Sequence, residues 1–115
     1  MRAWMTFNAK CGTARNVLEA LRARGIEPEI REYLNQPLTR AELAALVQEM
    51  GVTPSQILRW KETDTVAQAG ITEASSDAAL LDALAAHPIL LNRPIVRTPR
   101  GTKLCRPSET VAALL

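Results

Sequence analysis

Residues 1–34 alternate between extended and helical patterns, and this alternation restricts the fold. An apolar run at residues 2–7 predicts a short buried strand, and residues 13–24 predict a helix. Apolar side chains recur along that helix at the spacing of one helical face, and Gly25 supplies a stop. A second strand is expected from Pro28, in "PEIREYL". A strand, a helix and a strand with short joins predict a parallel βαβ unit with a right-handed crossover.

The middle of the chain, about residues 39–86, is predicted to be a helical insertion. Thr39 and Glu42 have the spacing of a capping box, and the apolar stripe that follows them ends at Gly51. Shorter helices are expected at residues 54–59, 62–69 and 77–86.

The last part of the chain returns to extended patterns. Two short strands, "PIVRT" and "TKLC", flank a turn in which Pro99 and Gly101 predict a type I turn with a bulge. A last helix is expected to begin near Pro107. The order βαβ, helices, ββα predicts an α/β fold of the thioredoxin-like kind. We expect the chain to form a single domain over residues 1–115, with a mixed four-stranded sheet flanked by helices.

Composition excludes several classes of function. The chain has 14 basic and 12 acidic residues, without a basic run, so we expect no nucleic-acid partner. No apolar run approaches the ~20 residues of a membrane span, and we expect no signal peptide before the first strand. We therefore expect a cytoplasmic protein without membrane association, and a monomer. Two cysteines are too few for a disulfide scaffold, and with His87 as the only histidine no metal site is expected.

A cysteine stands where the first strand meets the first helix, in "KCGT". Such a loop lies at the carboxyl edge of the sheet, where open α/β sheets bind ligands. The unpaired N–H groups of the helix N-terminus stabilise a thiolate and can also hold an oxyanion. Gly12 permits close approach of the backbone, Thr13 adds a hydroxyl, and Lys10 and Arg15 add positive charge. Cys11 is therefore a candidate nucleophile, and a small buried residue without chemistry is the alternative.

Four ordered stretches, "KCGTARN", "ILRWKE", "HPILLNRPIV" and "GTKLCRPSE", carry a family resemblance. Over nearly its whole length the chain resembles the glutaredoxin-coupled arsenate reductases of the thioredoxin-like fold. The resemblance implies that Cys11 attacks arsenate, supported by a loop that includes Asn8, Gly12 and Thr13. It implies that three arginines bind the oxyanion, namely Arg59, Arg93 and Arg106, and that the Arg93–Pro94 bond is cis. Several forked donors from different segments suit a tetrahedral anion.

The resemblance also implies a mechanism and its partners. The Cys11 thiolate displaces water from arsenate to form an S-arsenate adduct. Glutathione attacks the adduct, and glutaredoxin resolves the mixed species by thiol exchange as arsenite leaves. Glutathione is then a co-substrate, and no metal, flavin or tightly bound cofactor is expected.

Two departures from the family pattern keep other functions open. Phe7 stands where the best-known members have a histidine, and Ala14 where many have a serine. A related glutathione-dependent thiol oxidoreductase with another substrate is the first alternative. A non-enzymatic, redox-sensing transcription regulator is the second, although Ala14 breaks the CxxC pattern that such regulators use. Cys105, beside Arg106, is either a redox partner of Cys11 or a packing residue.

Overall fold

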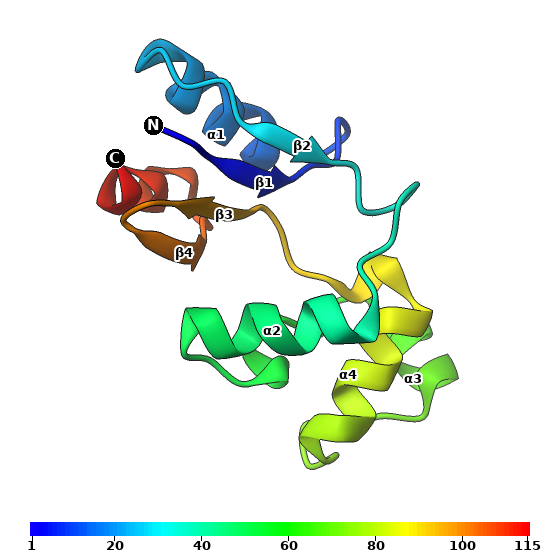
Figure 1. Ribbon diagram of the computed structural model, residues 1–115. Coiled ribbons are helices and arrows are strands. Elements are labelled where there is room, and N and C mark those ends of the chain that lie inside the picture. Colours follow the sequence, from blue (N-terminus) through cyan, green and yellow to red (C-terminus); the bar gives the residue numbers. More distant parts are fainter. The chain divides into compact units, whose positions relative to one another are not determined.

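The computed structural model describes residues 1–115 as two compact units (Figure 1). The sheet unit comprises residues 1–36 and 93–115, and the helical unit comprises residues 37–92. The elements of the sheet unit are β1 (Trp4–Thr6), α1 (Gly12–Ala23), β2 (Glu29–Arg31), β3 (Ile95–Thr98), β4 (Gly101–Leu104) and the 3₁₀ helix η3 (Ser108–Leu114). Those of the helical unit are α2 (Arg40–Met50), η1 (Pro54–Ile57), α3 (Thr63–Ala69), α4 (Asp77–Ala86) and η2 (Pro88–Leu90).

The sheet has the strand order β2-β1-β3-β4. β1 pairs with β2 in parallel, whereas β3 is antiparallel to both β1 and β4. The predicted mixed four-stranded sheet is confirmed, and α1 is the crossover between the two parallel strands (Figure 1).

One face of this sheet packs against α1 and η3. Its core consists of eight buried side chains: Met5, Val17, Leu21, Ile26, Val96, Cys105, Val111 and Leu114. Alternation along β1 explains the sidedness, because Met5 is fully buried while the preceding Trp4 is partly exposed. Packing of α1 against this face holds its N-terminus beyond the carboxyl end of β1.

Local signals define the ends of α2 in the helical unit. The predicted capping box is present: Glu42 N–H donates to Thr39 Oγ1 at 3.1 Å, and Thr39 N–H donates to Glu42 Oε1 at 3.0 Å. α2 ends at Gly51, which adopts the left-handed conformation with φ 69°. An N-cap side chain such as that of Thr39 stabilises a helix by about 1 kcal/mol.

The helix expected at residues 54–59 is shorter than predicted and is a 3₁₀ helix that ends at Ile57. Leu58 forms an antiparallel bridge with Leu91, and Arg59 N–H donates to the Leu90 carbonyl at 2.7 Å. Asn92 N–H donates to the Ile57 carbonyl at 2.8 Å. These bonds to a segment distant in sequence replace those that would extend the helix.

Three further predictions were partly wrong. The second strand covers only Glu29–Arg31, because the Glu32 carbonyl accepts from the N–H groups of Asn35 and Gln36 and the chain turns there. The last helix is a 3₁₀ helix, in which Thr110 N–H donates to the Pro107 carbonyl. The hairpin has no bulge, since Thr98 pairs directly with Gly101 in an unbroken register.

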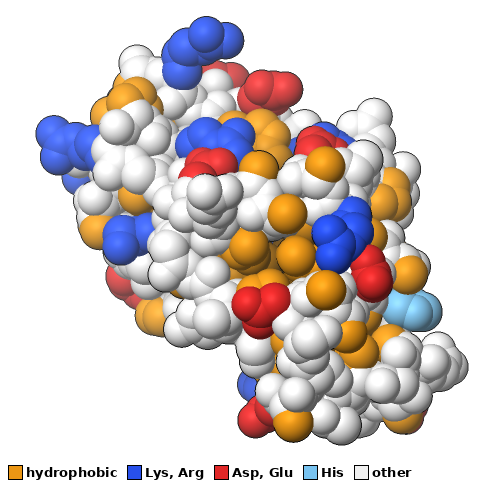
Figure 2. All heavy atoms as spheres, turned by 60° about the horizontal axis from the view of Figure 1, so that its bottom comes forward, with side chains coloured by type: hydrophobic (Ala, Val, Ile, Leu, Met, Phe, Trp, Pro, Cys, Tyr) orange, Lys and Arg blue, Asp and Glu red, His pale blue; other side chains and the backbone are white.

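Charged side chains are distributed over the surface without a continuous patch of one sign on the face in Figure 2. None of the helices has both the length and the apolar character needed to cross a membrane.

Candidate active site

The loop between β1 and α1 carries Cys11 and is held by hydrogen bonds from both of its ends. The Asn8 carbonyl accepts from Cys11 N–H at 2.9 Å, and Asn8 Oδ1 accepts from Lys10 N–H at 3.0 Å. Arg15 Nη1 donates to the Ala9 carbonyl at 2.7 Å. Cys11 is the N-cap residue of α1, and its side chain makes no capping hydrogen bond. A thiol therefore stands where helices usually place a capping oxygen.

Arg106 contacts the candidate nucleophile directly. Its Nη1 donates to Cys11 Sγ at 3.8 Å and also to the Arg93 carbonyl at 3.1 Å. One guanidinium thus links the sulfur to the segment that precedes Pro94. The Arg93–Pro94 bond is cis, as the family resemblance implies. The Arg106–Pro107 bond is cis as well, which sequence analysis did not anticipate.

Four influences act on the ionisation of Cys11. Burial of the thiol, which is 7 % exposed, raises its pKa. The Ala14 backbone N–H and the side chains of Arg93 and Arg106 stabilise the thiolate, and together they outweigh burial. The pKa of Cys11 is consequently lower than that of an ordinary thiol, which favours the nucleophilic form near neutral pH.

The β3–β4 hairpin brings the two arginines together. Ile95 pairs with Leu104 in the strand register, and Cys105 N–H donates to the Pro94 carbonyl at 2.8 Å. Arg93 and Arg106 flank this paired end of the hairpin and therefore lie near each other. The sequence alone does not give this neighbourhood, because it depends on which residues of two strands pair.

Arg59, the third predicted arginine, belongs to the helical unit. Its Nε lies 3.4 Å from Glu62 Oε1, and its Nη1 is buried without a hydrogen-bond partner. Glu62 was not identified from the sequence, although its spacing of three residues from Arg59 is the spacing of a helical ion pair. The structure brings Cys11, Arg93 and Arg106 together within the sheet unit, and it describes Arg59 only within its own unit.

The residues around Cys11 differ in whether packing restricts their side chains and in whether they offer a polar group to the thiol. A Cβ on Gly12 would meet only Arg15 Nη2 at 3.7 Å, an ordinary contact, so internal packing does not require glycine there. Thr13 is the second residue of α1. Phe7 packs against the core of the sheet unit and Ala14 is fully buried, so neither provides a polar side-chain group for the thiol.

Cys105 lies in a different environment. It is fully buried in the core of the sheet unit, and burial raises the pKa of its thiol to about 11. Both cysteines are free. Cys105 packs among apolar side chains, consistent with its interpretation as a packing residue.

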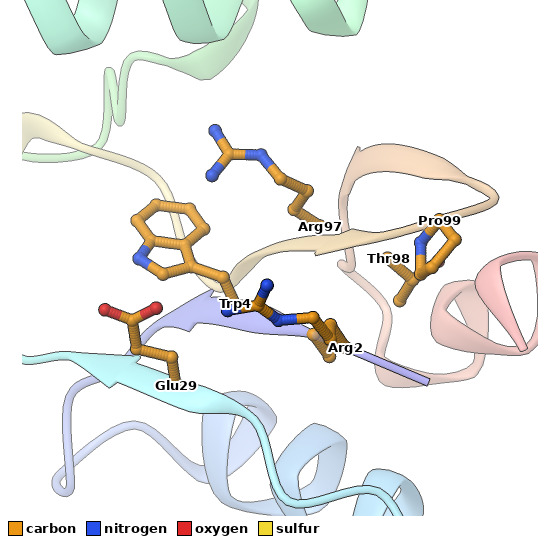
Figure 3. Close-up of a pocket in the computed structure, with 7 residues that line it drawn as sticks. Arg2, Trp4, Glu29, Arg97, Thr98 and Pro99 are labelled. Carbon is orange, nitrogen blue, oxygen red and sulfur yellow. The ribbon is translucent and has the colours of Figure 1, made fainter.

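Two surface hollows in the sheet unit lie elsewhere. One of about 340 Å³ contains Trp4 and Arg97, whose guanidinium carbon is 4.8 Å from the indole ring centroid (Figure 3). The other, of about 430 Å³, is lined by residues of α1 and η3. Neither is lined by Cys11, Arg93 or Arg106. The chain has no cluster of three or more His, Cys, Asp or Glu side chains that could hold a metal ion.

A thioredoxin-like sheet and a cysteine of lowered pKa at the N-terminus of its first helix define a class of thiol-dependent proteins. The model of the ArsC family matches residues 7–114, and the chain belongs to this family.

The relatives agree with this assignment. The chain is 50 % identical over 109 residues to an arsenate reductase of Rhizobium meliloti (strain 1021), covering 94 % of this chain and 77 % of the relative. It is 48 % identical over 109 residues to an arsenate reductase of Escherichia coli (strain K12), with the same coverage. The solved structure of arsenate reductase from Vibrio cholerae superposes with a TM-score of 0.89 at 33 % identity, covering 100 % of this chain and 98 % of that one. The thioredoxin-like fold prediction is confirmed.

Proposed function

We propose that this protein is an arsenate reductase that converts arsenate to arsenite through an S-arsenate adduct on Cys11. Glutathione and glutaredoxin supply the electrons, in a reducing cytosol. The contact between Arg106 Nη1 and Cys11 Sγ at 3.8 Å carries the proposal. It joins a thiol of lowered pKa to a forked donor suited to a tetrahedral oxyanion. The 50 % identity to a curated arsenate reductase supports the choice of substrate.

The first step forms the sulfur–arsenic bond. The Cys11 thiolate attacks arsenic, and one arsenate oxygen leaves as water after taking up protons, so that arsenic remains As(V). Negative charge moves from the sulfur to the arsenate oxygens during this step. The Ala14 N–H, Arg93 and Arg106, which stabilise the thiolate, are positioned to stabilise the adduct as well.

The later steps transfer electrons. The glutathione thiolate attacks arsenic and displaces an oxygen, which leaves as water. A glutaredoxin thiolate then attacks the glutathione sulfur to form a mixed disulfide, the bond between that sulfur and arsenic breaks, and its electron pair stays on arsenic. Two thiols end as one disulfide, and the two electrons they release convert As(V) to As(III). Water displaces the Cys11 sulfur from arsenic, which releases arsenite and regenerates the Cys11 thiol. No metal or tightly bound cofactor takes part in this scheme.

Arg59 is proposed as the third donor to the oxyanion. Its buried, unpaired Nη1 is the kind of group that an anion would satisfy. Glu62 engages Nε and would leave the other nitrogens available. We expect Arg59→Ala to raise KM for arsenate, whereas the neighbouring Lys61→Ala, which removes an exposed charge, leaves KM unchanged. Equal effects of the two variants would remove Arg59 from the proposal.

Turnover of arsenate coupled to NADPH oxidation through glutathione and glutaredoxin tests the function. We expect arsenate-dependent loss of NADPH that disappears with Cys11→Ser and persists with the control variant Cys105→Ala. If folded wild-type protein gives no turnover while a known arsenate reductase is active in the same mixture, the proposal is wrong.

A glutathione-dependent thiol oxidoreductase with another substrate is the second candidate. The observation that favours it is Phe7, which packs against the core and offers the thiol no polar group. Reduction of a small mixed disulfide by glutathione, measured with the same variants, distinguishes the two candidates.

A further inference from the structure

One charged side chain that contacts the nucleophile loop, that of Arg15, is not used by the proposed reaction. Arg15 is the fourth residue of α1, and the first turn of this helix has no acidic residue. A cation near a helix N-terminus opposes the helix dipole, so Arg15 carries an electrostatic cost at this position. A specific role in the loop would offset that cost.

Arg15 contacts the loop through both its main chain and its side chain. Its backbone N–H donates to the Cys11 carbonyl at 3.1 Å. Its Nη1 donates to the Ala9 carbonyl at 2.7 Å, a bond that spans six residues. Its Nη2 lies 3.7 Å from the point that a Cβ on Gly12 would occupy. The guanidinium therefore lies over residues 9–12 and joins the start of the loop to the first turn of the helix.

Apart from the bonds of Arg15 and the contact of Arg106 with Cys11 Sγ, the hydrogen bonds of this loop come from one residue, Asn8. Its carbonyl binds Cys11 N–H and its side chain binds Lys10 N–H, so both ties close turns within the loop. The side-chain bond of Arg15 differs from these, because it joins Ala9 of the loop to a residue of α1. The contact that Arg15 would preserve, between Arg106 Nη1 and Cys11 Sγ, is long at 3.8 Å, so a small displacement of the loop would weaken it.

We propose that Arg15 is a positioning residue whose guanidinium holds the nucleophile loop closed and so keeps Cys11 Sγ against Arg106 and the N-terminus of α1. This inference rests on the proposed function only in taking Cys11 as the reactive thiol. Displacements of about 1 Å at a reacting group are enough to reduce rates by roughly 10²-fold, so a restraint of this kind matters.

Alkylation of Cys11 by iodoacetamide, followed by mass spectrometry across about pH 5 to 9, tests the role of Arg15. The groups that stabilise the thiolate are the Ala14 N–H and the side chains of Arg93 and Arg106. Arginine side chains in general stay protonated throughout that range, so the profile follows the ionisation of Cys11. The pKa of Cys105, about 11, keeps that thiol unreactive under the same conditions.

We expect Arg15→Ala to slow alkylation at neutral pH by about three- to ten-fold, through a rightward shift of the profile. Arg15→Lys should recover part of the rate, since an ammonium also donates to a carbonyl. Arg24→Ala is the matched control, because it removes a cation from the other end of the same helix. The shift should persist in about 1 M KCl, where the Debye length is near 3 Å and long-range charge effects are screened.

Two results would overturn the proposal. One is an Arg15→Ala profile that coincides with that of Arg24→Ala. The other is a shift that disappears in concentrated salt, since the effect would then come from charge and not from positioning. The assay needs neither arsenate nor glutathione, so failure of the reductase proposal leaves its result interpretable.

Discussion

The two cysteines of the sheet unit have the same side chain and similar burial, yet their pKa values are shifted in opposite directions. Cys11 is 7 % exposed and its pKa is lowered, whereas Cys105 is 0 % exposed and its pKa is raised to about 11. Burial raises both values. The difference comes from the groups that face each sulfur, so burial alone does not predict thiol reactivity.

The surroundings of each sulfur follow from its place in the fold. Cys11 Sγ lies near the Ala14 N–H of a helix N-terminus and near the side chains of Arg93 and Arg106, and these groups lower its pKa. Cys105 Sγ lies 3.7 Å from the Lys103 carbonyl, an acceptor that favours the protonated thiol. Arg106 follows Cys105 in the sequence, but its guanidinium contacts Cys11. Neighbourhood in the sequence is therefore a poor guide to which thiol an arginine activates.

The largest expected effect distinguishes the two thiols by function. Cys11→Ser should reduce arsenate turnover by about 10³-fold or more, because serine is a far weaker nucleophile at neutral pH. Cys105→Ala should retain most of the activity, since Cys105 contacts no reacting group. The coupled NADPH assay measures both. Similar losses of activity in the two variants, with both shown to be folded by circular dichroism, would contradict the assignment of Cys11 as the reactive thiol and Cys105 as a packing residue.

The next effect concerns the donor at Cys11. Arg106→Ala should lower kcat by about 10²-fold, the usual loss for one oxyanion donor, and should raise the pKa of Cys11. Arg106→Lys should restore only part of the rate, because an ammonium does not reproduce the forked geometry. Steady-state kinetics and the pH profile of alkylation are the measurements. An unchanged kcat in Arg106→Ala would show that the contact with Sγ is incidental.

The pH dependence of reactivity gives a third test. Alkylation of Cys11 should rise with pH and reach its plateau below the range of an ordinary thiol, because its pKa is lowered. Cys105, with a pKa of about 11, should react at least about 100-fold more slowly at neutral pH. Mass spectrometry of peptides after timed alkylation reports each site separately. Comparable labelling of both sites in folded protein would contradict the difference in environment.

The smallest effect is on stability. Cys105→Ser should lower the free energy of unfolding by about 1–3 kcal/mol, because it places a hydroxyl in the apolar core. The matched variant Cys105→Ala introduces no polar atom and should lower stability by less. Urea denaturation of the two variants decides the order. A Cys105→Ser protein as stable as wild type would mean that the site is more polar than its neighbours indicate.

Local signals in the sequence predicted the elements whose ends depend on local contacts. The capping box of Thr39 and Glu42, the stop at Gly51 and the α4 bounds of Asp77–Ala86 agree with the prediction. Predictions were wrong where distant partners intervene, as at Leu58, which pairs with Leu91. The predicted bulge in the hairpin is absent for a similar reason, since the register is set by the pairing of whole strands.

The sequence by itself determined the order of the elements and the thioredoxin-like fold, and it placed Cys11 at the start of a helix, because periodicity and capping act over a few residues. Family resemblance added the identity of the arginines. Only the tertiary structure decided that Arg106 contacts Cys11 and that Cys105 lies in the core with a raised pKa. These properties depend on distances and local polarity between segments far apart in the chain, which no local pattern encodes.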